Sequence, residues 1–290
     1  MNAIDLHVHS SYSDGTCSPT ALVSLASNLS LSAFALTDHD TMDGIPEALQ
    51  AASQIPSAPE IIPGIELSTD YHGKDIHIVG LDLPYHSNSL QNFLAEQRKK
   101  RLQRNHRMID KMAADGIPIS YQKMADLFGE QVWTRAHFAH FLMSIHLVQS
   151  MREAFDLYVG EDCRYFIPSE KISPAEAVSV IRQFGGIPIL AHPLQYHFSE
   201  SDLRQLLQQL KASGLIAMEI YYSSYDETSV QFLTALADEY GIIPSGGSDF
   251  HGEHKPHISL GSGCGELHIP YEILKQLRSA NDTVWKGDET

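Results

Sequence analysis

Nine histidine and acidic side chains follow short apolar runs of this 290-residue chain. A polar group left unpaired in an apolar interior is costly to desolvate, so such positions suggest metal binding or proton chemistry. Two of the histidines stand one residue apart, a spacing that directs both side chains to the same face of a strand. The candidate metal ligands are His7, His9, Asp14, His39, Glu66, His77, His192, Asp249 and His251.

Any single member of this set has an ordinary alternative explanation. His77 alone, for example, is more often a hydrogen-bonded core side chain than a ligand. The set as a whole favours a multinuclear metal site, because segment after segment ends in the same residue types. The cysteines do not contribute, since Cys17, Cys163 and Cys264 form no C-x-x-C pair. His, Asp and Glu must therefore supply the ligands of any metal ion.

The composition is typical of a globular protein, with 43% apolar residues. No apolar stretch approaches the roughly 18 residues of a membrane span, and the N-terminus MNAIDLHVHS does not resemble a signal peptide. We therefore expect a cytoplasmic protein with no membrane association, and nothing in the sequence predicts a protein partner. The formal charge of −16 disfavours nucleic acid, but divalent ions would neutralise many of the carboxylates that it counts.

Short β-rich runs alternate with helical patterns along most of the chain. Ser18-Pro19 and Ser173-Pro174 have the residue types that cap and begin helices, and a third helix is expected over 199–213. The alternation predicts an α/β fold with a parallel sheet closed as a barrel, although the pattern alone also allows an open doubly wound sheet. The expected strands are Ala3–Val8, Ala33–Thr37, Ile61–Leu67, Ile76–Leu81, Ile187–Ala191, Ala217–Tyr221 and Ile242–Gly246.

The alternation stops from about residue 96 to residue 168, where the sequence is helical and polar. We expect residues 1–95 and 169–290 to form a metal-binding barrel, and residues 96–168 to form an inserted helical subdomain at the substrate entrance. Basic residues recur in the insert at helical spacing, which places them on one face as a solvated surface or an anion-attracting rim. These residues are Lys100, Arg104, Arg107 and Lys111.

The segments DLHVHSSYSDG, LTDHDT, IPGIELST, IHIVGLD, LAHP and GSDFH resemble the polymerase and histidinol phosphatase (PHP) family over almost the whole chain. This resemblance implies a distorted seven-stranded β/α barrel with up to three divalent ions at the carboxyl ends of its strands. By resemblance, Glu66 bridges two of the ions. The first ion is assigned to His7, His9, Glu66 and Asp249, the second to Glu66, His77 and His192, and the third to Asp14, His39 and His251.

Two segments of the insert, RNHRMIDKMAADGIP and WTRAHFAHFLM, are similar to one branch of the family. That branch contains 3′,5′-nucleotide bisphosphate phosphatases and 5′-to-3′ exoribonucleases. The resemblance implies that Arg135 and His137 bind the 5′-phosphate of the substrate, for which a planar guanidinium has suitable geometry. The alternative for Arg135 is a surface charge at a helix start, with Thr134 as the N-cap.

The implied substrates are 3′,5′-bisphosphonucleotides and short single-stranded oligonucleotides with a 5′-phosphate. Divalent ions at such a site make a water nucleophilic at neutral pH and bind phosphoryl oxygens. The leaving ribose oxygen needs a proton, for which Asp40, His197 and His254 are candidate acids. Asp38 is expected to orient a ligand histidine. Two to three ions are expected, with manganese first and zinc or iron as alternatives.

Three other functions fit parts of the sequence. A histidinol-phosphate phosphatase would share the metal site, but it does not account for the basic insert. An amidohydrolase barrel also begins with H-x-H, but it does not predict the set of Asp14, His39 and His251. A non-catalytic, metal-dependent interaction module would not need every ligand to be present.

Overall fold

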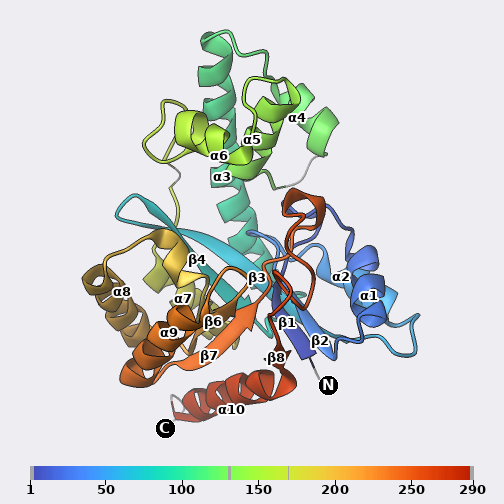
Figure 1. Ribbon diagram of the computed structural model, residues 1–290, viewed down its shortest axis with the longest axis vertical. Coiled ribbons are helices and arrows are strands. Elements are labelled where there is room, and N and C mark those ends of the chain that lie inside the picture. The colour runs from blue at the N-terminus through green and yellow to red at the C-terminus, as the bar shows by residue number, and fades with distance from the viewer. Residues whose placement is uncertain (1–2, 130–131, 169, 288–290) are drawn as a thin grey trace.

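The strands of the protein form one nearly closed barrel (Figure 1). The computed structural model describes residues 3–129, 132–168 and 170–287, and over these residues the sheet has eight strands in the order β7-β6-β5-β4-β3-β2-β1-β8. Backbone N–H groups of His9 and Asp249 donate to the carbonyls of Phe250 and His7, at 3.0 and 2.9 Å, and so link the end of β7 to β1. The strands are β1 (Ala3–Val8), β2 (Ala33–Leu36), β3 (Glu60–Tyr71), β4 (Lys74–Leu81), β5 (Ile187–Leu190), β6 (Ala217–Tyr222), β7 (Ile243–Gly247) and β8 (Ile269–Pro270).

The seven expected strands are all present, and the expected β/α barrel is confirmed. The parallel sheet was wrong at β4, which runs antiparallel to both β3 and β5. It was also wrong at β8, an eighth strand beyond the seven expected, which runs antiparallel to β1. Only His72 and Gly73 connect β3 to β4, and both have positive φ, 55° and 85°. A parallel connection needs a dozen or more residues, roughly, so a link this short can only form a hairpin.

The expected helix starts are confirmed by caps from Ser18, Ser173 and Ser199, which accept the backbone N–H groups of Ala21, Glu176 and Asp202. The helices packed around the barrel are α1 (Pro19–Asn28), α2 (Ile45–Ala52), α7 (Pro174–Gln183), α8 (Glu200–Ala212) and α9 (Glu227–Tyr240).

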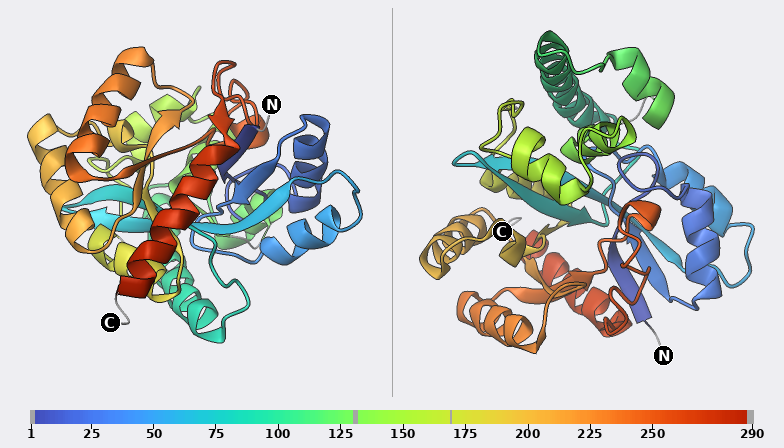
Figure 2. Two further views of the ribbon diagram at one scale, coloured as in Figure 1. Left: turned by 90° about the horizontal axis from the view of Figure 1, so that it is seen from below. Right: turned by 45° about the horizontal axis from the view of Figure 1, so that its top comes forward.

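The last helix, α10 (Tyr271–Gly287), lies across the underside of the barrel (Figure 2). Its Leu274 and Leu277 are fully buried and belong to the same apolar cluster as Ile4 and Ile189 of the strands. This packing removes the lower end of the barrel from water and leaves the opposite end for the polar side chains.

The insert stands above the barrel and has its own apolar core (Figure 1). Its first helix belongs to both parts, because Leu90 and Leu94 pack in the barrel core, whereas Met108 and Met112 pack in the insert. The expected boundary at residue 96 therefore falls within one continuous helix, and the division into domains stays a prediction. The helices are α3 (Asn88–Ala114), α4 (Tyr121–Phe128), α5 (Arg135–Ser144), α6 (Met151–Ala154) and the π-helical turn η1 (Phe155–Val159).

None of the helices in the described residues is long and apolar enough to cross a membrane.

Candidate metal centre

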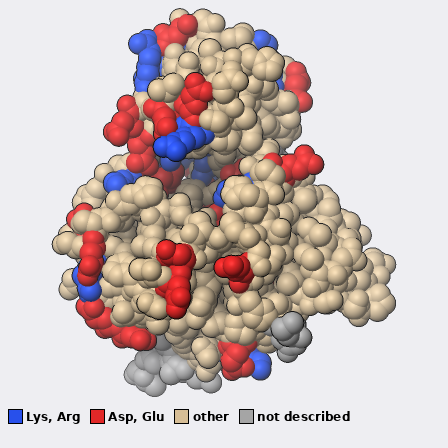
Figure 3. Space-filling view, viewed as in Figure 1, with Lys and Arg blue, Asp and Glu red and all other residues tan. Residues whose placement is uncertain are grey.

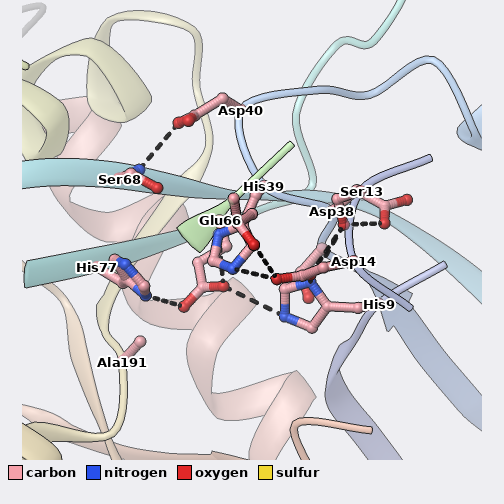
Figure 4. Close-up of polar contacts among 12 residues, drawn as sticks. His9, Ser13, Asp14, Asp38, His39, Asp40, Glu66, Ser68, His77 and Ala191 are labelled. Carbon is pink, nitrogen blue, oxygen red and sulfur yellow. Dashed lines mark hydrogen bonds and ion pairs between the residues drawn. The ribbon is translucent and has the colours of Figure 1, made fainter. Parts of the chain in front are cut away.

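The nine candidate ligands converge at one end of the barrel. Figure 4 shows five of them, with Glu66 between His77 and the group of His9, Asp14 and His39. The two carboxylate oxygens of Glu66 lie within hydrogen-bonding or ion-pair distance of five imidazoles. The distances from Glu66 are 3.4 Å to His7, 3.2 Å to His9, 3.1 Å to His39, 2.9 Å to His77 and 3.0 Å to His192. A single buried carboxylate surrounded in this way is suited to bridging cations.

Strand ends and strained backbone place the ligands. His7 lies on β1 and His9 just beyond it, while Glu66 lies within β3. His192 follows β5 and Asp249 follows β7, and both have positive φ, 28° and 56°. Left-handed backbone is unfavourable for residues other than glycine, so it points to a geometry that the site requires.

The possible ligand atoms fall into three overlapping groups. They are His7, His9 and Glu66; His39, Glu66 and His77; and His9, Asp14, His39 and His251, with the atoms of each group within 4.8 Å of one another. Asp249 and His192 adjoin these groups, since Asp249 Oδ1 lies 3.4 Å from His9 and His192 Nε2 lies 3.0 Å from Glu66. The structure brings all nine residues together, but His9 and His39 each belong to two groups. The assignment of ligands to individual ions stays a prediction.

The hydrogen bonds of the imidazoles suit cation binding. His7 donates from Nδ1 to Glu219 at 2.8 Å, and its Nε2 faces His9 Nε2 at 3.0 Å. Burial alone would lower the pKa of His9, but Asp249 and Glu66 raise it to about 9, so positive charge is favoured here. In addition, His192 Nδ1 is buried and has no hydrogen-bond partner among the described residues. The donor set therefore fits divalent ions.

Asp40 is paired with an arginine that the sequence did not indicate as its partner. Arg101 of α3 forms an ion pair with Asp40, and Asp40 also accepts the backbone N–H of Ser68 at 2.9 Å. Burial tends to raise the pKa of Asp40, but Arg101 and the bond from Ser68 bring it below its ordinary value. A carboxylate paired in this way has no proton to give at neutral pH. This geometry argues against Asp40 as the acid and favours a role in positioning Arg101.

A cavity of about 420 Å³ opens beside the ligands, and Lys and Arg side chains gather near the hollow between insert and barrel (Figure 3). Arg101, Arg104 and Arg135 all line this cavity. Arg104 is 4% exposed, and its Nε has no hydrogen-bond partner among the described residues. Burial, followed by repulsion from Arg101 and Arg135, lowers the pKa of Arg104 to about 9. An anion in the cavity would relieve this uncompensated charge.

The expected basic face of α3 is therefore divided. Arg104 is its only member that lines this cavity, while Arg107 and Lys111 are exposed to solvent. Arg101 lies three residues before Arg104, on the same face of α3, and it also lines the cavity.

Arg135 lines the same cavity, and its expected role in binding phosphate stays a prediction. Its side chain is 15% exposed and lies 3.2 Å from Asp75 and 3.6 Å from Glu161. Its guanidinium also lies over the ring of Phe166, 5.4 Å from the centroid. Lys171 contacts the same Asp75, so this carboxylate does not depend on Arg135 alone.

The structure argues against His137 as a phosphate ligand. His137 is 1% exposed, and its Nδ1 accepts the backbone N–H of Thr134 in the capping box of α5. Burial lowers its pKa to about 4, so the ring is neutral at pH 7. Of the two remaining candidate acids, His197 lines the cavity with the guanidiniums, whereas His254 hydrogen-bonds the carbonyl of Asp14 through Nδ1.

The family model of the PHP domain matches residues 5–161. The chain belongs to the PHP family. A 5′-3′ exoribonuclease of Haemophilus influenzae is 38% identical over 247 residues, which are 85% of this chain and 89% of that protein. A 3′,5′-nucleoside bisphosphate phosphatase of Chromobacterium violaceum is 31% identical over 254 residues, covering 87% and 88% of the two chains. Both relatives are hydrolases, so the expected family, branch and enzyme class are confirmed.

A solved structure has the same fold over almost its whole length. An amidohydrolase from Chromobacterium violaceum, with bound sulfate and no metal, superposes with a TM-score of 0.83 and 28% identity. The match covers 96% of each chain, so it includes both the insert and the barrel.

Several residues contact the candidate ligands and hold them in place, a role that the sequence did not indicate for most of them. Tyr222 and Lys255 contact Asp249 Oδ2, each at 2.6 Å, while Oδ1 faces His9. Thr134 of the insert donates to Asp14 at 3.0 Å. Of this supporting group, the sequence indicated only Asp38, which accepts from Ser13 beside His9.

Of the supporting residues, Glu219 is the one that the sequence could have indicated, because it is an acidic residue within the apolar strand β6. Glu219 is 2% exposed, and its carboxylate accepts from both His7 Nδ1 and the backbone N–H of His192. We expect Glu219→Gln to weaken metal affinity by roughly 10- to 100-fold, since glutamine has no negative charge and only one acceptor oxygen for the two N–H donors of His7 and His192. Competition with a chelator measures the change, and an unaltered affinity would exclude this role.

Proposed function

We propose that this protein is a metal-dependent phosphoesterase that removes the 3′-phosphate of 3′,5′-bisphosphonucleotides. By the same reaction it releases 5′-mononucleotides from short, single-stranded, 5′-phosphorylated oligonucleotides in the 5′-to-3′ direction. The observation that carries the proposal is the buried guanidinium of Arg104, whose Nε has no hydrogen-bond partner among the described residues, in a cavity lined by Asp14, His39, His77 and His192. An anion-binding cavity that opens onto a candidate metal centre suits a substrate with two phosphoryl groups.

Two or three divalent ions would be held by the nine ligands, and manganese is our first choice for a site of imidazoles and carboxylates. When bound, the ions would supply a nucleophilic water and would offset charge on the phosphoryl oxygens. The protein itself orients the ligands through Glu219, Ser13 and Tyr222. Arg101 and Arg104 line the place where the phosphoryl oxygens gather negative charge, and this stabilises the transition state.

One reaction accounts for both substrates. Water adds to the 3′-phosphorus, the bond from phosphorus to O3′ breaks, and O3′ takes a proton as the nucleotide leaves. A 3′-phosphate is released as inorganic phosphate, whereas a 3′-diester leaves a new 5′-phosphate on the remaining chain. The relatives named as a bisphosphate phosphatase and an exoribonuclease are consistent with this single scheme.

The direction of cleavage follows if the 5′-phosphate is anchored. Arg135 lies in the same cavity as Arg101 and Arg104 and can offer its guanidinium to this group. Substrate would have to displace Asp75 and Glu161 from Arg135, and a phosphate dianion is a stronger partner than a carboxylate that keeps Lys171. The sulfate in the related amidohydrolase structure shows that a similar protein binds a tetrahedral oxyanion.

A substrate panel with manganese tests the proposal. We expect 3′,5′-bisphosphoadenosine and 5′-phosphorylated oligonucleotides to be cleaved. We also expect removal of the 5′-phosphate to lower kcat/KM by roughly 10- to 100-fold, since each hydrogen bond between charged groups contributes about 1.5–3 kcal/mol. Preference for histidinol phosphate would instead indicate a small-molecule phosphatase. If 5′-hydroxyl and 5′-phosphate substrates react equally, the anchoring scheme is wrong.

A further inference from the structure

A second cavity, of about 540 Å³, also opens onto the metal centre. Four candidate ligands line both cavities, namely Asp14, His39, His77 and His192. Phe155 of the insert also lines both. A group bound at the ligands therefore has two spaces beside it, and each is within the roughly 300–1,000 Å³ range of ligand pockets.

The two cavities differ in charge. The first contains Arg101, Arg104 and Arg135, and none of the three lines the second. The second has one lysine, Lys255, whose Nζ already lies 2.6 Å from Asp249. A terminal phosphate with two negative charges suits the first cavity. The second suits a group with little charge of its own.

The walls of the second cavity offer surfaces for a base. Met151, Phe155 and Ile258 are apolar, and two imidazoles, His140 and His254, stack with ring centroids 4.0 Å apart and an interplanar angle of 27°. The bond from His254 to the carbonyl of Asp14 fixes the orientation of this pair. Flat rings and apolar side chains bind nucleobases by stacking without reading their sequence.

We propose that the second cavity binds the nucleoside on the 3′ side of the scissile phosphorus. This inference rests on the proposed function and extends it to the path of the substrate. The first nucleotide lies in the arginine-lined cavity, the phosphorus lies at the metal centre, and the chain continues into the second cavity. When the bond to O3′ breaks, the phosphorus stays attached to O5′ of the nucleoside in the second cavity. A bisphosphonucleotide has no such nucleoside and needs only the first cavity.

Negative charge placed in the second cavity should therefore separate the two activities. His257 and Cys264 line this cavity and are exposed to solvent. Neither residue lines the arginine-lined cavity. In the manganese-loaded enzyme, we expect His257→Glu and Cys264→Glu to lower kcat/KM for 5′-phosphorylated oligonucleotides by roughly tenfold, because the new carboxylates repel the diester backbone. Activity on 3′,5′-bisphosphoadenosine should change much less.

Gln208→Glu provides the matched control, since Gln208 is exposed on α8 and lines neither cavity. Melting temperatures equal to wild type would show that the variants fold. If both substrates lose activity equally, or if neither does, the second cavity does not bind the chain and the inference is wrong. If wild type cleaves neither substrate, the proposed function itself fails, and the two failures are thus distinguishable.

Discussion

Replacing Glu66 with Gln is expected to abolish catalysis through loss of bound metal. The carboxylate of Glu66 contacts five imidazoles and is 1% exposed, so an amide in its place leaves the ligands without their shared negative charge. An amide oxygen also cannot bridge two cations as a carboxylate does. Because metal ions contribute several kcal/mol to such a reaction, we expect kcat/KM to fall by roughly 10³-fold or more.

The metal content of purified Glu66→Gln, measured by elemental analysis, distinguishes this cause from unfolding. We expect fewer ions per chain, with the barrel still folded as judged by circular dichroism. Glu272→Gln is the control, because Glu272 is exposed on α10 and pairs only with Lys275 among the described residues. A variant that keeps both its ions and its activity would show that Glu66 does not bridge the metal centre.

Several candidate ligands could be predicted because they lie at the ends of strands that the local sequence indicates. His7 and His9 share a strand face through their spacing, and His192 and Asp249 follow two of the expected strands. The carboxyl ends of neighbouring barrel strands meet at one rim, so residues far apart in sequence come together there. The same local information fixed the caps at Ser18 and Ser173.

Partners across long separations could not be predicted in this way. The pair of Arg101 and Asp40 joins residues that lie 61 positions apart. Helical spacing places Arg104 on the same face as Lys100 and Arg107, but it does not say where the face divides between core and solvent. That division depends on how the insert packs above the barrel.

The sequence held local signals for the capping role of His137 and for the antiparallel strand β4. Thr134 and His137 stand at the N-cap and N3 positions of a capping box, so the histidine was available to cap α5 rather than to bind substrate. The short interval between β3 and β4 left no room for a parallel crossover.

Replacing Arg135 with Ala is expected to remove the preference for a 5′-phosphate. Wild type should cleave 5′-phosphorylated oligonucleotides with a kcat/KM roughly 10- to 100-fold above that for 5′-hydroxyl ones, and the variant should cleave both at the lower rate. The loss should be specific, because Asp75 keeps its contact with Lys171 and is not left unpaired. Kinetics on paired substrates that differ only at the 5′ end measure the ratio directly.

Arg152→Ala controls for loss of charge in the insert, since that side chain is 91% exposed and lines neither cavity. Arg135→Lys separates charge from geometry. Lysine keeps the positive charge but cannot form two parallel hydrogen bonds, so we expect it to restore only part of the preference. If Arg135→Ala slows both substrates equally, Arg135 supports the fold of the cavity, and another cation that lines it, Lys74, Arg101 or Arg104, must bind the 5′-phosphate. The arginine that carries the preference therefore fixes where the first nucleotide lies, and with it the end from which the enzyme starts.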